Sequence, residues 1–255
     1  RHPSAPWLGI PATALMDDDA LVERLKARGI YHLLQHFSVG DEPATPDSGC
    51  IKQFERFQEV KKHLASKGVA VQETSTSNSG AICQGVGVDE TYVRPGLILY
   101  GMRAGCGVDG PLFTQGRMVA NLCTKVLHCF HAKKGETIGY GHFALPRDGF
   151  VVMIPFGYAD GMMPCQPGKR RVCINGHWGT LFGKINMDIS SILLDEAPTS
   201  SAEAKSLDEV IKPDDDVELW GGENCNARMA EVAREHDTIP YQIMCMVSVR
   251  VPRDY

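Results

Sequence analysis

The positions of the apolar residues divide the chain into two parts with different periodicities. Up to about residue 115, apolar residues recur every three or four positions, which predicts helices with one buried face. One such stripe covers residues 51–64 and ends before Gly68, and another covers residues 21–25 and ends at Gly29. Glycine just after the last apolar position is a common signal for a helix C-terminus. Each stripe therefore predicts a helix that its glycine closes.

Short apolar runs lie between these helices. Those at residues 30–37 and 93–100 predict strands, the one at residues 69–71 predicts the beginning of another, and two prolines within residues 41–49 predict a loop. Strands that alternate with helices form parallel βα units, in which each helix connects two neighbouring strands. The first part of the chain therefore predicts an α/β domain.

Strand-like runs dominate the chain after about residue 117. The predicted strands lie at residues 126–130, 149–154, 172–174, 189–194, 217–220 and 243–251. Asn175 and Gly176 follow one of these runs and precede another apolar stretch, which is a strong signal for a two-residue hairpin turn. One clear helix is predicted at residues 227–235. We therefore expect one domain over residues 1–116 and a β-rich domain over residues 117–255.

Composition and charge exclude several classes of function. The 255 residues carry a net charge of -5 at pH 7, which gives no reason to expect nucleic acid or an anionic membrane as a partner. No apolar run approaches the roughly 20 residues that a membrane-spanning helix needs. Nine cysteines occur without a Cys-x-x-Cys pair, so we expect reduced, buried thiols in a cytoplasmic protein and no metal site.

Three motifs carry a resemblance to a known family: Gly-Tyr-Ala-Asp-Gly at 157–161, Gly-Lys-Ile-Asn-Met-Asp at 183–188 and Arg-Val-Pro-Arg at 250–253. In this order and at this spacing they resemble the C-terminal half of alanine racemase, and the resemblance extends over nearly the whole chain. It implies an α/β fold. Residues 1–116 would belong to an incomplete TIM-like (β/α)8 barrel that binds pyridoxal 5'-phosphate (PLP), and residues 117–255 would form the β-rich C-terminal domain.

Two segments of the first domain match the cofactor-binding part of that family. Asn78 and Ser79 follow a predicted strand and open a helical turn, where a hydroxyl and free amides suit a phosphate. By itself this pattern is more often that of an ordinary helix N-cap. Together with Arg94, Gly96 and Leu97, the resemblance assigns these residues to PLP binding, with Arg94 at the pyridine nitrogen. Guanidinium does not readily give up a proton, so that nitrogen would remain unprotonated.

Four residues of the second domain match substrate and catalytic positions. Tyr140 lies between two glycines and resembles the tyrosine that transfers a proton on one face of the substrate, although an aromatic residue in a turn is the structural alternative. Inversion of a stereocentre by proton transfer requires a second group, a lysine in this family, on the opposite face. The resemblance also implies that Tyr158 gates the substrate channel and that the Met187 amide binds the substrate carboxylate. Tyr241 would reach the cofactor phosphate.

Two parts of the family's site are not recognised in this sequence. No lysine stands in a context that resembles the Schiff-base lysine, and the arginine that contacts the substrate carboxylate is also not found. We therefore expect these residues in an N-terminal part outside the sequence, and we expect this chain alone to be inactive. His36 stands beside an apolar residue and is expected to be part of the scaffold, as most such histidines are.

The resemblance as a whole predicts PLP-dependent interconversion of L-alanine and D-alanine, which would supply D-alanine for peptidoglycan. It also implies a homodimer with composite active sites, in which the β domain of one subunit covers the barrel of the other. Two alternatives stay open. One is a serine or broad-specificity racemase on the same scaffold, and the other is a non-catalytic pseudoenzyme that serves as an assembly module.

Overall fold

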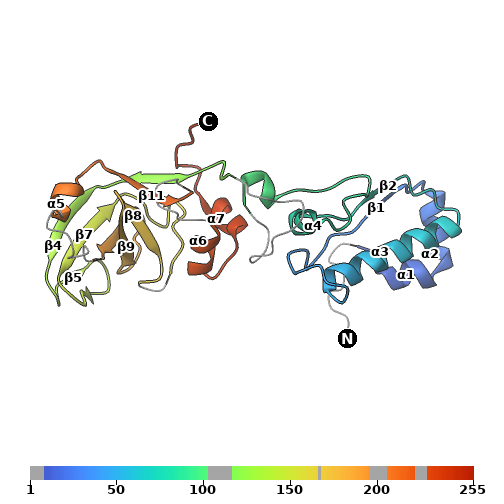
Figure 1. Cartoon of the computed structure of the whole chain (residues 1–255), viewed down its shortest axis with the longest axis horizontal. Helices are drawn as coiled ribbons and strands as arrows, with labels where there is room; N and C mark the ends of the chain where they lie inside the picture. The colour runs from blue at the N-terminus through green and yellow to red at the C-terminus, as the bar shows by residue number, and fades with distance from the viewer. Residues whose placement is uncertain (1–8, 103–116, 166–167, 196–205, 222–228) are drawn as a thin grey trace. The chain divides into compact units, whose positions relative to one another are not determined.

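The computed structural model describes residues 9–102, 117–165, 168–195, 206–221 and 229–255. Contacts divide the chain into two compact units, Arg1–Arg117 and Met118–Tyr255. Each unit has its own core and is described by itself (Figure 1). Within the described ranges, no helix is long and apolar enough to cross a membrane. No group of three or more His, Cys, Asp or Glu side chains in those ranges is arranged to hold a metal ion.

Three helices form one side of the first unit: α1 (Ala12–Asp17), α2 (Asp19–Ala27) and α3 (Gly49–Ser66). The Asp18 side chain caps α2 and the Ser48 side chain caps α3, each by accepting a hydrogen bond from a backbone amide of the first turn. Both predicted helical stripes are confirmed, and both terminal glycines adopt positive φ. The helices share a buried apolar cluster of Leu15, Val22, Val60, Leu64 and Val69.

The strands of the first unit are parallel and short. β1 (His32–Leu34) pairs in parallel with β2 (Glu73–Ser75), and Ser75 forms a further parallel bridge with Tyr92 (Figure 1). Because α3 lies between β1 and β2 in the chain, these elements form the expected βα unit. Successive strand ends thus lie side by side, at the edge where α/β proteins place their functional residues.

Two strand predictions in this unit are wrong. The strand predicted at residues 69–71 forms at Glu73–Ser75 instead, because Val69 is buried against the helices and its amide bonds to Leu64 at the end of α3. The run at residues 93–100 contains no strand. It holds Pro95, which lacks a backbone donor, and then the 3-10 helix η1 (Leu97–Tyr100).

A short helix, α4 (Ser79–Gln84), follows β2 and packs on the loop after β1. Its approach to that loop is close, because a Cβ atom on Gly80 would lie 2.4 Å from the carbonyl oxygen of Gly40. Glycine is therefore required at this contact. A second apolar cluster of Phe37, Cys50, Ala81 and Val86 holds α4 against α3.

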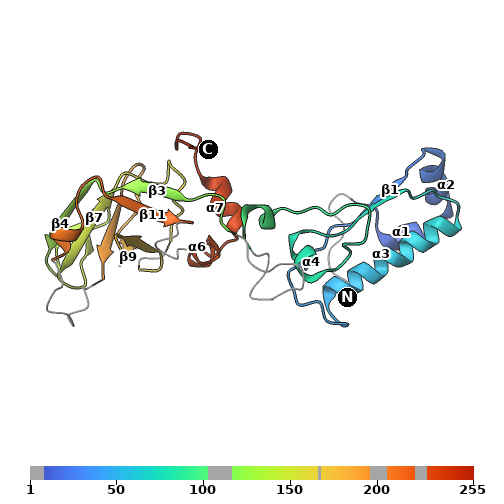
Figure 2. The same cartoon turned by 45° about the horizontal axis from the view of Figure 1, so that its top comes forward.

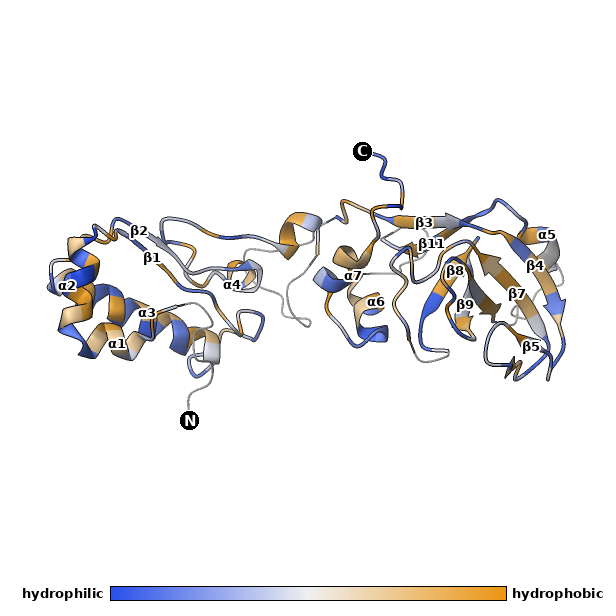
Figure 3. Cartoon of the chain, turned by 180° about the vertical axis from the view of Figure 1, so that it is seen from behind, coloured by the Kyte–Doolittle hydropathy of each residue, from blue (hydrophilic) through white to orange (hydrophobic). Residues whose placement is uncertain are grey.

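The second unit is built on one antiparallel sheet of seven strands in the order β3-β11-β8-β9-β10-β7-β4. The strands are β3 (Leu122–Lys125), β4 (His128–Ala132), β7 (Gly149–Ile154), β8 (Arg171–Ile174), β9 (His177–Phe182), β10 (Ser190–Leu194) and β11 (Asp216–Trp220). The sheet curls, with β3 beside β11 at one edge (Figure 2). Every residue of β10 is buried, and Figure 3 shows strongly hydrophobic colouring along β7.

Most strand predictions for this unit are confirmed within one or two residues. The run at 126–130 is the exception, because Val126 and Leu127 link β3 to β4 and only its last three residues belong to a strand, β4. Asn175 and Gly176 form the predicted tight turn between β8 and β9, with φ of 50° and 81°. Positive φ at both positions is what the favoured two-residue hairpin turn requires.

Helices cover part of this unit: α5 (Leu207–Val210), α6 (Met229–Glu235) and α7 (Pro240–Met246). The helix predicted at residues 227–235 is confirmed for its described part. The strand predicted at residues 243–251 is wrong, since α7 continues to Met246 and a turn follows. Pro240 favours the first turn of a helix, and a short apolar run does not distinguish helix from strand by periodicity.

The cysteine prediction needs one correction. All seven described cysteines are free, and Cys50, Cys83 and Cys173 are buried as expected. Cys123 and Cys245 are exposed instead, because they lie on an edge strand and on a partly exposed helix. The other two cysteines, at positions 106 and 225, lie outside the described residues.

Candidate functional site

Arg94 lies where the parallel strands of the first unit end. Its Nη2 atom donates hydrogen bonds to the carbonyl oxygens of Gln35 (2.6 Å) and Thr76 (3.3 Å), and its Nη1 atom donates to the Ser75 hydroxyl. The Ser75 hydroxyl in turn donates to the Tyr92 carbonyl oxygen at 3.0 Å. Burial lowers the pKa of the Arg94 guanidinium, yet an arginine remains a cation in proteins. The side chain is thus a charge that two neighbouring segments hold in place, one at Gln35 and one at Ser75 and Thr76.

His36, which the sequence predicts to be part of the scaffold, lies beside Arg94. Its Nδ1 atom lies 3.5 Å from Nη2 of Arg94, and its ring is only partly covered. Burial and the nearby charge of Arg94 both lower the pKa of His36. The signal that indicates it is positional: His36 comes two residues after β1, at the same edge as the end of β2.

Ser79 brings the predicted phosphate-binding groups together. Its Oγ atom accepts hydrogen bonds from the amides of Gly96 (2.8 Å) and Ile98 (3.5 Å), so a hydroxyl and two backbone donors converge. Leu97, between them, is buried. The Asn78 side chain serves the scaffold, since its Oδ1 atom accepts from the Ala81 amide at 3.2 Å and its Nδ2 atom donates to the Phe37 carbonyl at 3.0 Å.

Tyr140 stands on the loop that joins β5 (Thr137–Ile138) to β6 (Phe143–Ala144). Gly139, Gly141 and His142 in this loop have φ of 66°, 90° and 52°, a region that glycine enters without strain. The side chain of Tyr140 is 73% exposed. Two flanking glycines therefore form a tight turn that presents the phenol outward.

Tyr158 and Met187 lie on two segments that pair through their backbones. The Tyr158 amide donates to the Asn186 carbonyl at 3.0 Å, and the Ala159 amide donates to the Met187 carbonyl at 3.0 Å. The side chains of Tyr158 and Met187 are 51% and 53% exposed. Within the described residues the Met187 amide has no hydrogen-bond acceptor, which leaves it able to bind an anion. The segments also adjoin the Tyr140 loop, since a Cβ on Gly141 would lie 3.4 Å from Lys184 Cε.

The comparisons with known proteins agree over both units. The model for the alanine racemase C-terminal domain matches residues 119–255, and the model for the N-terminal domain matches residues 8–104. The chain belongs to the alanine racemase family. The resemblance inferred from the motifs is therefore confirmed.

Two relatives illustrate the similarity. The alanine racemase of Clostridium novyi is 32% identical over 242 residues, which cover 92% of this chain and 57% of that protein. The alanine racemase of Desulforamulus reducens is 33% identical over 237 residues, which cover 91% of this chain and 58% of that protein. The chain thus spans a little more than half of the length of these relatives.

Solved structures agree on the fold. The alanine racemase of Streptomyces coelicolor matches with a TM-score of 0.77 and 25% identity, covering 97% of this chain and 62% of that one. The biosynthetic alanine racemase of Pseudomonas aeruginosa matches with a TM-score of 0.74 and 25% identity, covering 93% and 62%. These matches confirm the α/β fold class, with part of a TIM-like barrel followed by the β-rich domain of alanine racemases.

The groups of the first unit fit PLP, the cofactor that membership of the alanine racemase family implies. Ser79 Oγ and the amide of Gly96 offer the hydroxyl and backbone donors that a phosphate takes. Within the described part of the chain, Nε of Arg94 has no hydrogen-bond partner. An aromatic nitrogen can thus accept a hydrogen bond from this atom. A phosphate on a heteroaromatic ring matches this donor set.

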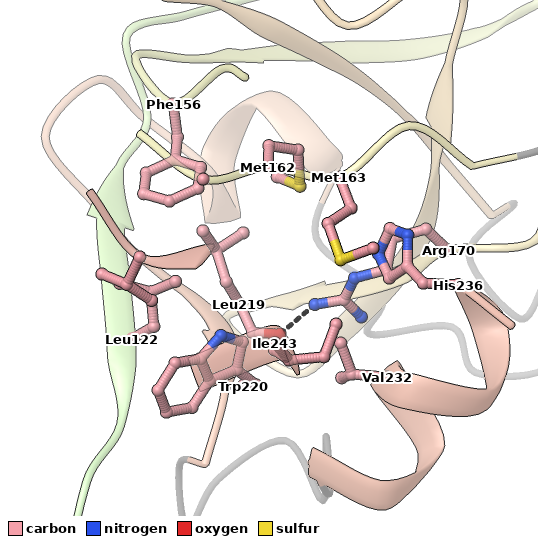
Figure 4. A pocket seen from close by; sticks show the side chains of 12 residues that line it. Leu122, Phe156, Met162, Met163, Arg170, Leu219, Trp220, Val232, His236 and Ile243 are labelled. Carbon is pink, nitrogen blue, oxygen red and sulfur yellow. Dashed lines mark hydrogen bonds between the residues drawn. The ribbon is translucent and has the colours of Figure 1, made fainter. Parts of the chain in front are cut away.

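Tyr241, the remaining predicted site residue, lies in the first turn of α7 and is 41% exposed. Behind this helix lies a cavity of ≈ 20 Å³ between α6, α7 and β11 (Figure 4). The buried side chain of Arg170 lines it, donates to the Leu219 carbonyl and forms an ion pair with Glu235 at 3.0 Å. A space of this size holds about one water molecule.

Proposed function

We propose that the full-length protein containing this chain interconverts L-alanine and D-alanine with PLP. The observation that carries the proposal is Tyr140, whose phenol is exposed on a turn fixed by two glycines at positive φ. Such a phenol transfers a proton on one face of a bound amino acid. Inversion also needs a group on the other face, for which the family uses a lysine, and no lysine of this chain is assigned to that role.

Arg94, Ser79 and the amides of Gly96 and Leu97 would hold the cofactor, with Asn78 supporting Ser79 as the cap of α4. Tyr241 would add its hydroxyl to the phosphate. When bound, PLP supplies an aromatic ring that accepts the negative charge arising at the substrate carbon. Because the Arg94 guanidinium keeps its own protons, it would donate a hydrogen bond to the ring nitrogen without protonating it, and the ring would then accept less of the negative charge. This restraint favours return of the proton over side reactions.

The Met187 amide would bind the carboxylate of alanine, and Tyr158 would line the way to it. The free amide of Met187 and the exposed ring of Tyr158 support these roles. The D-alanine formed would serve peptidoglycan synthesis. Free thiols at all seven described cysteines support a cytoplasmic location, where the cell keeps thiols reduced.

We further propose that the active form is a homodimer with composite sites. Ser79 and Arg94 lie in the first unit, whereas Tyr140, Tyr158 and Met187 lie in the second. The second unit of one subunit would cover the strand ends of the other, and a twofold axis would close the assembly. The exposure of Tyr140, Tyr158 and Met187 supports a role for this surface in an assembly.

The proposal is tested with the purified full-length protein, PLP and L-alanine. Formation of D-alanine, measured with a D-amino-acid oxidase, is expected to follow added PLP and to reach an equal mixture from either enantiomer. Serine is assayed in parallel. Comparable kcat/KM for serine would favour a broad-specificity racemase, and no turnover of any amino acid would favour a non-catalytic assembly module.

A further inference from the structure

Arg250 joins two motifs that are far apart in the sequence. Its Nε atom lies 2.7 Å from Oδ1 of Asp160, and its Nη2 atom lies 2.6 Å from Oδ1 of Asp188. The two carboxylates accept from different nitrogens of one planar guanidinium, a fork that a lysine cannot reproduce. The Gly-Tyr-Ala-Asp-Gly and Asn-Met-Asp segments are thus tied to the end of the chain by one side chain.

Asp160 is the more constrained of the two carboxylates. Its side chain is only 12% exposed, and its second oxygen accepts from the Gly157 amide at 2.8 Å. Its carbonyl oxygen accepts from the Ser248 amide at 2.9 Å. Without Arg250, this carboxylate would be mostly buried and would face Asp188 with no positive charge between them. Removal of one partner of such a pair is costly because it leaves the other unpaired.

The backbone leaves little freedom between the same segments. A Cβ atom on Gly157 would lie 2.3 Å from the carbonyl oxygens of both Asn186 and Met187. This contact and the two backbone hydrogen bonds fix one side of the pair of segments, while Arg250 fixes the other. Tyr158 is next to Gly157, and Met187 is next to Asp188, so a shift of either acid displaces a residue of the proposed substrate site.

We propose that Arg250 is a positioning residue for substrate binding: it holds the Met187 amide and the Tyr158 ring at a fixed separation. The inference rests on the proposed function. The hydrogen bonds that Arg250 donates to Asp160 and Asp188 raise its pKa, so the guanidinium keeps its charge over the working pH range. Because the Met187 amide would bind the substrate carboxylate, loss of the Arg250 side chain should weaken substrate binding more than it slows proton transfer.

The test compares Arg250→Ala, Arg250→Lys and Arg253→Ala in the full-length protein. Arg253 is the matched control, since within the described residues its guanidinium donates only to the backbone carbonyls of Val247, Ser248 and Val251. For Arg250→Ala we expect KM for alanine to rise by about 10-fold or more with kcat within about 3-fold, the pattern of lost binding. Arg250→Lys should recover part of the loss because it keeps the charge.

A second readout separates binding from catalysis. Propionate carries the carboxylate of alanine without its amino group, and its competitive inhibition constant should rise in the same proportion as KM. The PLP dissociation constant, governed by the first unit, should stay unchanged. An unchanged KM and propionate constant in Arg250→Ala, or an equal rise in Arg253→Ala, would overturn the inference. If Arg250→Ala fails to fold, an unchanged KM in Arg250→Lys would also overturn the inference.

Amide hydrogen exchange makes the test independent of the proposed function. Residues 157–161 and 186–188 should exchange faster in Arg250→Ala than in the wild type, with the β7–β10 strand amides unchanged. If the wild type does not racemise alanine but this exchange pattern appears, Arg250 does hold the two segments and the proposed function is wrong. If racemisation is found and exchange at these residues is unaltered, the proposed function holds and the positioning role of Arg250 is wrong.

Discussion

The Nδ1 atom of His36 lies 3.5 Å from Nη2 of Arg94 at the edge where β1 and β2 end. A guanidinium has donors only, so the Nδ1 atom of His36 is the acceptor in this contact, a role that the neutral imidazole can fill. The lowered pKa of His36, caused by burial and by Arg94, agrees with this assignment. Burial and the neighbouring arginine thus both favour the neutral form of the histidine.

Arg94→Lys should weaken cofactor binding, although it conserves the charge. An ammonium cannot reach Gln35, Ser75 and Thr76 together from one position, so the cation would lose its fixed place. We expect the PLP dissociation constant, measured by fluorescence titration, to rise on the order of 10-fold or more. Arg56→Lys, on the exposed side of α3, is the control and should leave the constant unchanged. Tight PLP binding by Arg94→Lys would contradict the role of Arg94.

Tyr140→Phe removes one hydroxyl from an exposed side chain. Stability should therefore be unaltered, whereas loss of a proton-transfer group should lower kcat on the order of 10²-fold or more. Racemisation rates and thermal unfolding of the same preparations measure both effects. Tyr31→Phe, also exposed but in the other unit, should change neither. Near-wild-type turnover by Tyr140→Phe would remove the phenol from the mechanism.

Two inactive full-length variants should complement each other if the sites are composite. Arg94→Glu damages the cofactor site, and Tyr140→Phe damages the proton-transfer residue. Random exchange gives half of the dimers as mixed, and each mixed dimer has one intact site of two, so activity should return to about a quarter of wild type. Exchange is followed by mass-tagged subunits. Demonstrated exchange without recovered activity would mean that both residues act within one chain.

His236 should make the protein sensitive to acid. Burial is the main cause that lowers its pKa from 6.5, and the charge of Arg170 lowers it further. The unfolded chain therefore binds this proton more readily than the folded one, so stability is full above about pH 6.5 and falls as the pH drops towards the folded-state pKa. Urea unfolding at pH 7.5 and 5.5 should give a smaller loss for His236→Gln than for the wild type. An equal loss would assign the acid sensitivity to other groups.

The sequence predicts local features better than long-range ones. The stripe at residues 51–64 and the Asn175-Gly176 turn carry their own signals in periodicity and backbone preference, and both form as predicted. The run at residues 243–251 fails because packing, not periodicity, decides whether a short apolar segment becomes a helix. The motifs indicate Tyr140, Tyr158 and Met187. Neither pattern nor spacing predicts that Arg250 reaches Asp160, since that contact joins residues 90 positions apart.

The link between β3 and β4 sets the shape of the β-rich unit. These strands occupy opposite edges of the seven-stranded sheet, yet only Val126 and Leu127 separate them in the chain. In a flat sheet, six spacings of about 4.8 Å would put the edges about 29 Å apart. Three steps of chain, from Lys125 to His128, reach no more than about 11 Å.

The sheet must therefore bend until its first and last strands approach each other at this corner. A sheet folded in this way offers little open edge for another chain to extend by backbone pairing. We therefore expect another chain to contact this unit through side chains of its loops, such as the exposed Tyr140 and Tyr158. A single substitution can alter such a side-chain contact.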